Sequence, residues 1–227
     1  QVSGLGYAVL LTDDKGVTVD FIGDLQFDAS LRKTGLYLGS VWSEQFAGTN
    51  GVGTCLSTGE SLTVHQADHF DAMHIPLTCT AAPIYGATGK IKAVLDLSAL
   101  HSPEEKQSQH FALQLVRMYT HQIENAYFLS EFRNDWILRL ASGPHFLEVD
   151  PEYLLALNQR GEVIGHNRRA QQLFQTPSRP VLLGQKVDSL LQLSLNELGN
   201  FTSKNQFESQ SVTVMQTHQV LSLRVSA

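Results

Sequence analysis

The sequence predicts an α+β fold in which antiparallel sheets are flanked by helices. The apolar run Leu5 to Leu11, a turn at Asp13-Asp14-Lys15-Gly16 and the alternating stretch Val17 to Ile22 indicate a β-hairpin. A long helix is expected after Ser102-Pro103-Glu104-Glu105, which is typical of a helix start, because no glycine or proline follows until Gly143-Pro144. Short alternating strands combined with one long helix favour this fold class.

Composition excludes several classes of protein. The chain has 227 residues, 42% of them hydrophobic and 17% charged, which is typical of one large or two ordinary globular domains. A net charge of −6 argues against direct nucleic-acid binding by this fragment. The apolar runs are too short for a membrane span and no secretory signal is present, so we expect a cytoplasmic protein. The start at Gln1, with no initiator Met, suggests a fragment of a longer protein.

The elements after the hairpin converge on a glycine-rich loop. A helix is predicted over 25–34, ending at Gly35, and 36–46 then leads into Gly48-Thr49-Asn50-Gly51-Val52-Gly53-Thr54. Glycine and asparagine allow positive φ and close backbone approach. A short helix over 54–58 follows, and the remaining strands of this region are expected at 60–65, 77–85 and 90–97.

The glycine-rich loop lacks the spacing of a nucleotide site. Its glycines follow G-x-x-G-x-G, and no Lys-Ser/Thr pair comes after them. A tight turn that enters a short helix is the favoured interpretation. The alternative is that the loop amides also bind a ligand oxygen.

The string from Trp42 to Thr54 (W-S-E-x-x-x-G-T-N-G-V-G-T), His69-Phe70, the segment 77–83 and the strand 89–98 carry a family resemblance. Residues 5–100 resemble a GAF sensor domain, most closely that of the acetoin catabolism regulator group among sigma-54-dependent bacterial activators. The resemblance implies a module that senses a small polar effector, an acetoin-like alcohol or carbonyl compound. It also implies AAA+ and DNA-binding domains outside this fragment, and no cofactor.

The expected effector site combines the residues of the loop with a histidine-rich segment. The family resemblance implies that the segment from His65 to Cys79 lies at the cavity. The candidate ligand-binding residues are Trp42, Asn50, His65, His69, Phe70 and Cys79. We expect no metal, because the spacing of His65, His69, His74 and Cys79 is irregular, and partly buried or ligand-donating histidines are the favoured interpretation.

Two other groups leave alternatives open. Cys55, near a helix start, and Cys79, within a strand, allow the alternative of a thiol enzyme that reduces free methionine sulfoxide, which requires an exposed thiolate. The sequence around the loop favours a regulator, so no catalytic residue is expected. Asp96 lies in an apolar strand and either points outward or accepts a ligand hydroxyl, with the outward orientation favoured.

The long helix is predicted to span 102–142. It has an apolar series with alternating spacings of three and four, with a second stripe beside it. The first series contains Val116, Tyr119, Ile123, Ala126, Ile137 and Leu140, interrupted by Ser130 and Arg133. These stripes favour a homodimer helix, and the alternative is a helix that bridges two domains.

The last third of the chain resembles a PAS domain. Strands at 152–158 and 163–166 and a helix at 167–174 contain the pattern G-H-N-R-R-A, which resembles a PAS opening. A helix over 187–198 and paired strands at 210–214 and 219–225 complete the expected domain.

The predicted organisation is therefore a GAF core at 1–101, the connecting helix at 102–142 and a PAS-like domain at 143–227. A ligand-free scaffold for dimerisation or partner docking is the remaining alternative function.

Overall fold

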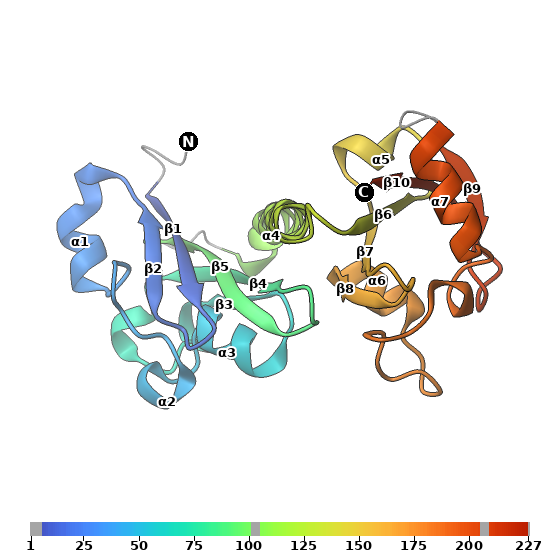
Figure 1. The fold of residues 1–227 in the computed structure, drawn as a ribbon. Coiled ribbons are helices and arrows are strands. Elements are labelled where there is room, and N and C mark those ends of the chain that lie inside the picture. Colours follow the sequence, from blue (N-terminus) through green and yellow to red (C-terminus); the bar gives the residue numbers. More distant parts are fainter. Residues whose placement is uncertain (1–5, 101–104, 205–208, 227) are drawn as a thin grey trace. The chain divides into compact units, whose positions relative to one another are not determined.

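The computed structural model describes residues 6–100, 105–204 and 209–226. The chain forms two compact units (Figure 1). Unit 1 consists of Gln1–Ile84 and Ile91–His121, and unit 2 consists of Tyr85–Lys90 and Gln122–Ala227. Each unit contains a five-stranded sheet with antiparallel pairing. The prediction of helices combined with antiparallel sheets is confirmed, whereas the three-part domain division stays a prediction.

The sheet of unit 1 has the strand order β2-β1-β5-β4-β3. The predicted N-terminal hairpin is confirmed, since β1 and β2 pair with Val9 opposite Ile22. Along β1 every second side chain is buried, as expected for a strand with one face on a core. The five strands are β1 Tyr7–Asp13, β2 Thr18–Ile22, β3 Leu62–His65, β4 Thr78–Tyr85 and β5 Ile91–Ala99.

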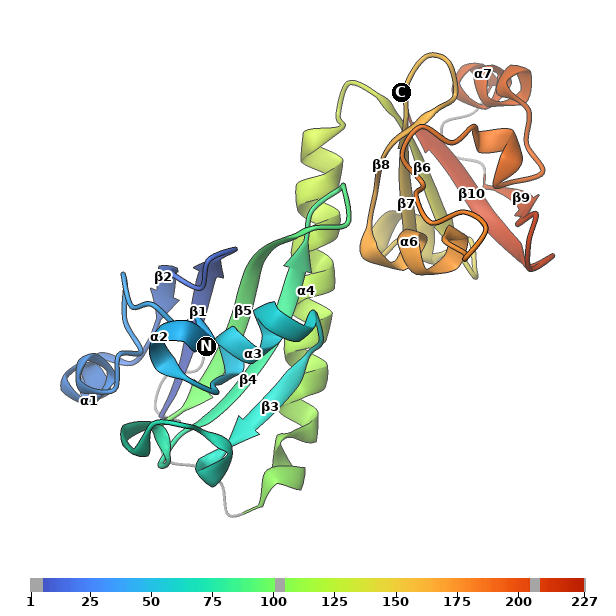
Figure 2. The same cartoon turned by 90° about the horizontal axis from the view of Figure 1, so that it is seen from below.

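Helices cover both faces of this sheet. The helix α3 packs against one face, and the first half of α4 runs along the opposite face (Figures 1 and 2). The central strands are consequently covered on both sides, and seven of the eight residues of β4 are buried. The helices are α1 Asp28–Lys33, α2 Glu44–Ala47, α3 Gly51–Thr58 and α4 His110–Glu131, with 3-10 turns η1 Leu25–Phe27, η2 Gln66–Asp68, η3 Ala72–His74 and η4 Lys106–Gln109.

The long helix is shorter than the sequence pattern predicts. The helix α4 ends at Glu131, and Trp136–Ala141 forms strand β6. Ile137 and Leu140 therefore do not extend the helical stripe, because their side chains are buried in the sheet of unit 2. The expectation of one helix up to residue 142 is wrong at this end, since strand pairing with β7 and β10 overrides the uninterrupted apolar periodicity.

The sheet of unit 2 has the strand order β8-β7-β6-β10-β9. The predicted pairing of the last two strands is confirmed, with Val220 opposite Thr213. The predicted helix over 187–198 is instead a 3-10 turn, η5, followed by α7. The elements are β6 Trp136–Ala141, α5 Phe146–Val149, β7 Tyr153–Leu157, β8 Val163–His166, α6 Arg168–Phe174, η5 Val187–Ser189, α7 Leu195–Lys204, β9 Gln210–Thr213 and β10 Val220–Ser226.

Both faces of β7, in the sheet of unit 2, are buried. Leu155 and Leu157 of β7 belong to the larger core, which includes residues of α6 and α7. Their neighbours Leu154 and Ala156 pack in a smaller cluster with Phe128 and Phe132. A continuous apolar run is the expected pattern for such a doubly covered strand.

The β4–β5 turn belongs to unit 2 by its contacts. Ala87 O accepts a hydrogen bond from the backbone N–H of His166 at 2.9 Å. The backbone N–H of Tyr85 donates to Glu124 Oε1 at 2.6 Å, and the guanidinium of Arg168 lies 4.4 Å from the centre of the Tyr85 ring. The G-H-N-R-R pattern thus supplies residues that hold this turn.

Candidate functional site

The glycine-rich loop is shaped by the side chain of Asn50, which caps α3. Its Oδ1 accepts a hydrogen bond from the Gly53 N–H at 2.9 Å. Its Nδ2 donates to the carbonyl oxygens of Trp42 and Gly48, both at 2.8 Å. Asn50 is 1% exposed. Because every hydrogen-bonding group of this amide is used within the protein, Asn50 fixes the loop.

Two glycines of α3 permit close packing. A Cβ on Gly51 would lie 2.8 Å from Cys79 Cβ and 3.0 Å from Asp96 Oδ1, and one on Gly53 would lie 2.6 Å from Trp42 O. A side chain at Gly51 would therefore push α3 away from β4 and β5, and one at Gly53 would push it away from the backbone of Trp42. The sequence indicated this close approach, although α3 begins at Gly51, earlier than expected.

A small cavity lies between α3 and the sheet. Its volume is about 10 Å³, room for about one water molecule. Its accessible wall is almost entirely apolar, although three of the residues that line it have polar or ionisable side chains besides Trp42 and Cys79. The lining residues are Leu10, Leu36, Trp42, Asn50, Gly51, Val52, Cys79, Asp96 and Ser98.

Asp96 is buried at this cavity, so the favoured outward orientation is wrong. Its exposed fraction is 1%, and it shares the buried side of β5 with Val94 and Ser98. Oδ2 lies 2.5 Å from Ser98 Oγ, whereas Oδ1 has no hydrogen-bond partner in the structure. Burial raises the pKa of Asp96 to about 7, and the Ser98 hydrogen bond lowers it in part.

Trp42 supplies a second polar atom without a partner. The indole is 4% exposed, and its Nε1 has no hydrogen-bond acceptor in the structure. The ring also packs against the imidazole of His74, with ring centres 5.2 Å apart. An unmet buried hydrogen-bonding group costs about 1–3 kcal/mol. A molecule that bound both Trp42 Nε1 and Asp96 Oδ1 would recover this cost.

Cys79 and His69 form a neutral pair beside the cavity. His69 Nδ1 lies 3.0 Å from the Gln66 carbonyl oxygen, which only accepts, so Nδ1 bears the proton. Burial lowers the pKa of His69, and its Nε2 is then an acceptor 3.4 Å from Cys79 Sγ. Burial also raises the pKa of the Cys79 thiol, which therefore donates to His69 as S–H.

Three other histidine-segment residues occupy different surroundings. His65 Nδ1 lies 2.9 Å from Thr78 Oγ1 at the end of β3. His74 packs on Trp42. Phe70 is 81% exposed and does not line the cavity. The structure thus places Trp42, Asn50 and Cys79 at the cavity wall and His69 in contact with Cys79.

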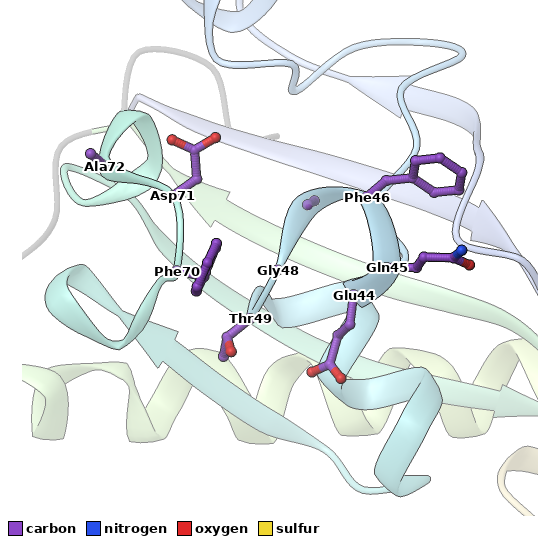
Figure 3. Close-up of a pocket in the computed structure, with 9 residues that line it drawn as sticks. Glu44, Gln45, Phe46, Gly48, Thr49, Phe70, Asp71 and Ala72 are labelled. Carbon is purple, nitrogen blue, oxygen red and sulfur yellow. The ribbon is translucent and has the colours of Figure 1, made fainter.

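An open groove of about 670 Å³ lies on the outer side of the loop (Figure 3). Phe70 packs against the backbone of Gly48, where a Cβ would lie 2.4 Å from the ring. The Phe70 N–H donates to Thr49 O at 3.1 Å. The groove is lined by Glu44, Gln45, Phe46, Ala47, Gly48, Thr49, Phe70, Asp71 and Ala72.

The groove and the cavity involve residues that are neighbours in the sequence. Thr49 lines the groove and the next residue, Asn50, lines the cavity. In the same way, Phe70 lines the groove, and its neighbour His69 contacts Cys79. These two backbone segments are joined by the Phe70–Thr49 hydrogen bond, and we refer to them as the wall.

Neither cysteine has the environment of a catalytic thiol. Cys55 is the fifth residue of α3 and fully buried, and burial raises its pKa to about 12.

Within residues 6–100, 105–204 and 209–226, no group of three or more His, Cys, Asp or Glu side chains is placed to hold a metal ion. No helix in this part of the chain is long and apolar enough to cross a membrane.

Comparison with curated proteins finds transcriptional regulators. The acetoin catabolism regulatory protein of Cupriavidus necator is 52% identical over 99% of this chain and 34% of its own length. The propane 2-monooxygenase operon transcriptional activator MimR of Mycolicibacterium smegmatis is 28% identical over 83% of this chain and 31% of its own. The acetoin dehydrogenase operon transcriptional activator AcoR of Bacillus subtilis is 29% identical over 39% of this chain and 15% of its own.

The chain spans about a third or less of the length of these relatives. A model of the family described as "MimR, N-terminal domain" matches residues 1–125, more than half of the chain. The chain thus belongs to the MimR N-terminal domain family, and it resembles the sensory region of the acetoin catabolism regulators.

Proposed function

We propose that this chain is the effector-sensing region of a sigma-54-dependent transcriptional activator, and that the cavity of unit 1 is its effector site. The observation that supports the proposal most is a pair of buried, unpartnered atoms, Asp96 Oδ1 and Trp42 Nε1, that belong to residues lining that cavity. Buried polar groups in proteins nearly always have a partner, so a bound molecule is the natural occupant.

In this proposal unit 1 is a GAF domain and unit 2 a PAS-like domain. The effector is a small polar metabolite, an acetoin-like alcohol or carbonyl compound, in keeping with the name of the regulator from Cupriavidus necator. Apolar walls with a few convergent polar atoms suit such a molecule. Since the cavity holds about one water molecule, the effector must move α3 or the loop before it, and this shift is the start of the signal.

The signal leaves unit 1 through covalent connections. One is α4, and the other is the turn Tyr85–Lys90, which joins β4 to β5. These two strands bear Cys79 and Asp96, while the turn is hydrogen-bonded to Glu124 and His166. A shift of the strands at the cavity would therefore change the strain at these contacts.

A homodimer formed along α4 completes the proposal. Five large apolar side chains of this helix are exposed, at 40–73%, and three of them, Tyr119, Ile123 and Tyr127, follow at intervals of four residues and so lie along one side. Exposed apolar stripes of this kind mark interfaces. The five exposed side chains of α4 are Phe111, Met118, Tyr119, Ile123 and Tyr127. The AAA+ and DNA-binding domains lie outside this fragment.

The effector proposal is tested by thermal unfolding with acetoin, 2,3-butanediol and butanone. At about 100 times its dissociation constant, an effector should stabilise the wild type by about 2.7 kcal/mol. Trp42→Phe keeps an aromatic ring but removes the donor, and should weaken binding about tenfold. Trp136→Phe, in unit 2, is the matched control and should bind normally.

Two results would contradict this proposal. One is the absence of stabilisation by any of the three compounds, which favours a ligand-free scaffold. The other is equal stabilisation of the wild type and Trp42→Phe, which places the effector elsewhere.

A further inference from the structure

We propose that Asp96 selects uncharged effectors, because it binds them as a neutral carboxylic acid whose proton lies on Oδ1 and is donated to an effector oxygen. This inference rests on the proposed effector site. It assigns a specificity role to a residue whose sequence context favoured an outward orientation.

The position of the proton follows from the neighbours of the carboxyl group. The Ser98 hydroxyl oxygen lies 2.5 Å from Asp96 Oδ2 and 3.1 Å from Cys79 Sγ, and its one proton goes to Oδ2, because a carboxyl oxygen is a stronger acceptor than sulfur. The acid's own proton then belongs on Oδ1, the oxygen that has no partner, on a residue that lines the cavity. The carboxyl thus presents a donor to the cavity and keeps its acceptor for Ser98.

The surroundings of Asp96 keep it neutral. The nearest titratable groups are the thiols of Cys79 on β4 and Cys55 on α3, and burial keeps both protonated. His69, beyond Cys79, is also neutral by burial. None of the cavity-lining residues, all of which the structure describes, is positively charged. An ionised Asp96 would have no counter-ion, in agreement with its pKa of about 7.

Two donors then converge on one cavity, Asp96 Oδ1–H and Trp42 Nε1–H. They fit an uncharged molecule with two acceptor oxygens, such as a hydroxy ketone. A carboxylate of the same size would bring a net negative charge into an apolar space without a cation, which is strongly unfavourable. Asp96 therefore discriminates by charge, and Trp42 and Asp96 together select for oxygen acceptors.

The test compares acetoin with lactate, in which an anionic oxygen replaces one methyl group of acetoin. We expect calorimetry of the wild type to detect acetoin but no lactate at neutral pH. Acetoin affinity should fall by up to about tenfold per pH unit above the pKa of Asp96, since the donor is lost there.

Three variants separate this role from a structural one. Asp96→Asn retains a donor at all pH values, so acetoin should still bind, with a pH-independent affinity. Asp96→Leu should abolish binding. Glu124→Gln removes a buried carboxyl of unit 2 whose pKa burial also raises to about 7, and it should leave the pH profile of binding unchanged.

A measurement without ligand keeps the inference independent of the effector. The infrared difference spectrum between the wild type and Asp96→Asn should show a protonated carboxyl band that disappears as the pH rises through neutrality. If this band is absent at pH 6, Asp96 is ionised and the inference is wrong whatever binds. If the band is present and acetoin binds, but lactate binds equally well, the selectivity is wrong although the site stands. If neither the wild type nor Asp96→Asn binds acetoin while the band is present, the proposed acetoin-like effector is wrong. The selection role of Asp96 is then wrong as well.

Discussion

Two buried carboxyl groups have a pKa that folding changes strongly. Asp96 in unit 1 and Glu124 in unit 2 both have a pKa that burial raises to about 7. Their environments differ, because Glu124 accepts a hydrogen bond from the Tyr85 N–H, whereas one oxygen of Asp96 has no partner. The first arrangement holds a turn in place, and the second leaves a group available for a ligand.

Because of these raised pKa values, each of the two carboxyl groups contributes to the free energy of unfolding an amount that decreases as the pH rises to neutrality. The folded protein binds their protons more tightly than the unfolded chain, whose carboxyl pKa is about 4. The stabilisation is complete below that value and is lost as the pH rises to about 7, at about 1.4 kcal/mol per pH unit for each group. Urea unfolding between about pH 5 and pH 8 measures this slope.

Asp96→Asn and Glu124→Gln should each remove one of these two contributions, and the double variant should remove both, which leaves the opposite slope from His69 and His166, whose pKa burial lowers. An unchanged slope in both single variants would show that neither carboxyl retains its proton near neutral pH.

The elements around the cavity show what a linear pattern reveals and what it does not. The glycine-rich loop is predictable from the sequence, because clustered glycines indicate close packing of the backbone. Gly51 and Gly53 are the positions where α3 packs closely on its neighbours. The orientation of Asp96 is not predictable in this way, since strand alternation gives two faces but not which of them is covered, and both faces of β5 lie under helices. Strand β6 was missed because Trp136 to Leu140 continue the helical spacing, and only pairing with β7 and β10 decides between the two structures.

Phe70 illustrates a further limit of sequence reasoning. The pattern grouped it with His69, Trp42 and Cys79 as a ligand-binding residue. Adjacent residues of an extended segment point in opposite directions, so His69 points inward while Phe70 lies in the groove (Figure 3). Its assignment as a direct ligand contact stays a prediction, and its packing on Gly48 indicates a role in closing the wall.

The wall between groove and cavity predicts how Cys79 becomes accessible. Replacing Phe70 by Ala removes the ring that packs on Gly48, and a loss of about 1.4 kcal/mol in local opening energy raises labelling about tenfold. Modification of Cys79 by methyl methanethiosulfonate, followed by mass spectrometry in a Cys55→Ala protein, measures this rate. Phe46→Ala, also in the groove but not part of the wall hydrogen bond, should have little effect.

Cys55 in a Cys79→Ala protein is the control for general loosening, and its labelling rate should not respond to Phe70→Ala. If Phe70→Ala leaves the Cys79 rate unchanged, or raises both rates equally, the groove is not the way to the cavity.

In the proposed mechanism, two copies of the whole molecule assemble through α4. Tyr119→Glu together with Ile123→Glu places charges on exposed positions and should produce monomers that still bind effector. Ile137→Glu would not test this, because Ile137 is buried in unit 2. Light scattering decides the matter, and a wild-type monomer at high micromolar concentration would show that α4 is only a connector.

Tryptophan fluorescence tests directly whether an effector occupies the cavity beside Trp42. The chain has two tryptophans, so Trp136→Phe leaves Trp42 as the single emitter. On titration with acetoin, we expect a saturable change in Trp42 emission at the concentrations that stabilise the protein, because Nε1 gains a hydrogen-bond partner. The emission of Trp136 in a Trp42→Phe protein should stay constant. Constant Trp42 emission in a protein that acetoin stabilises would contradict the account.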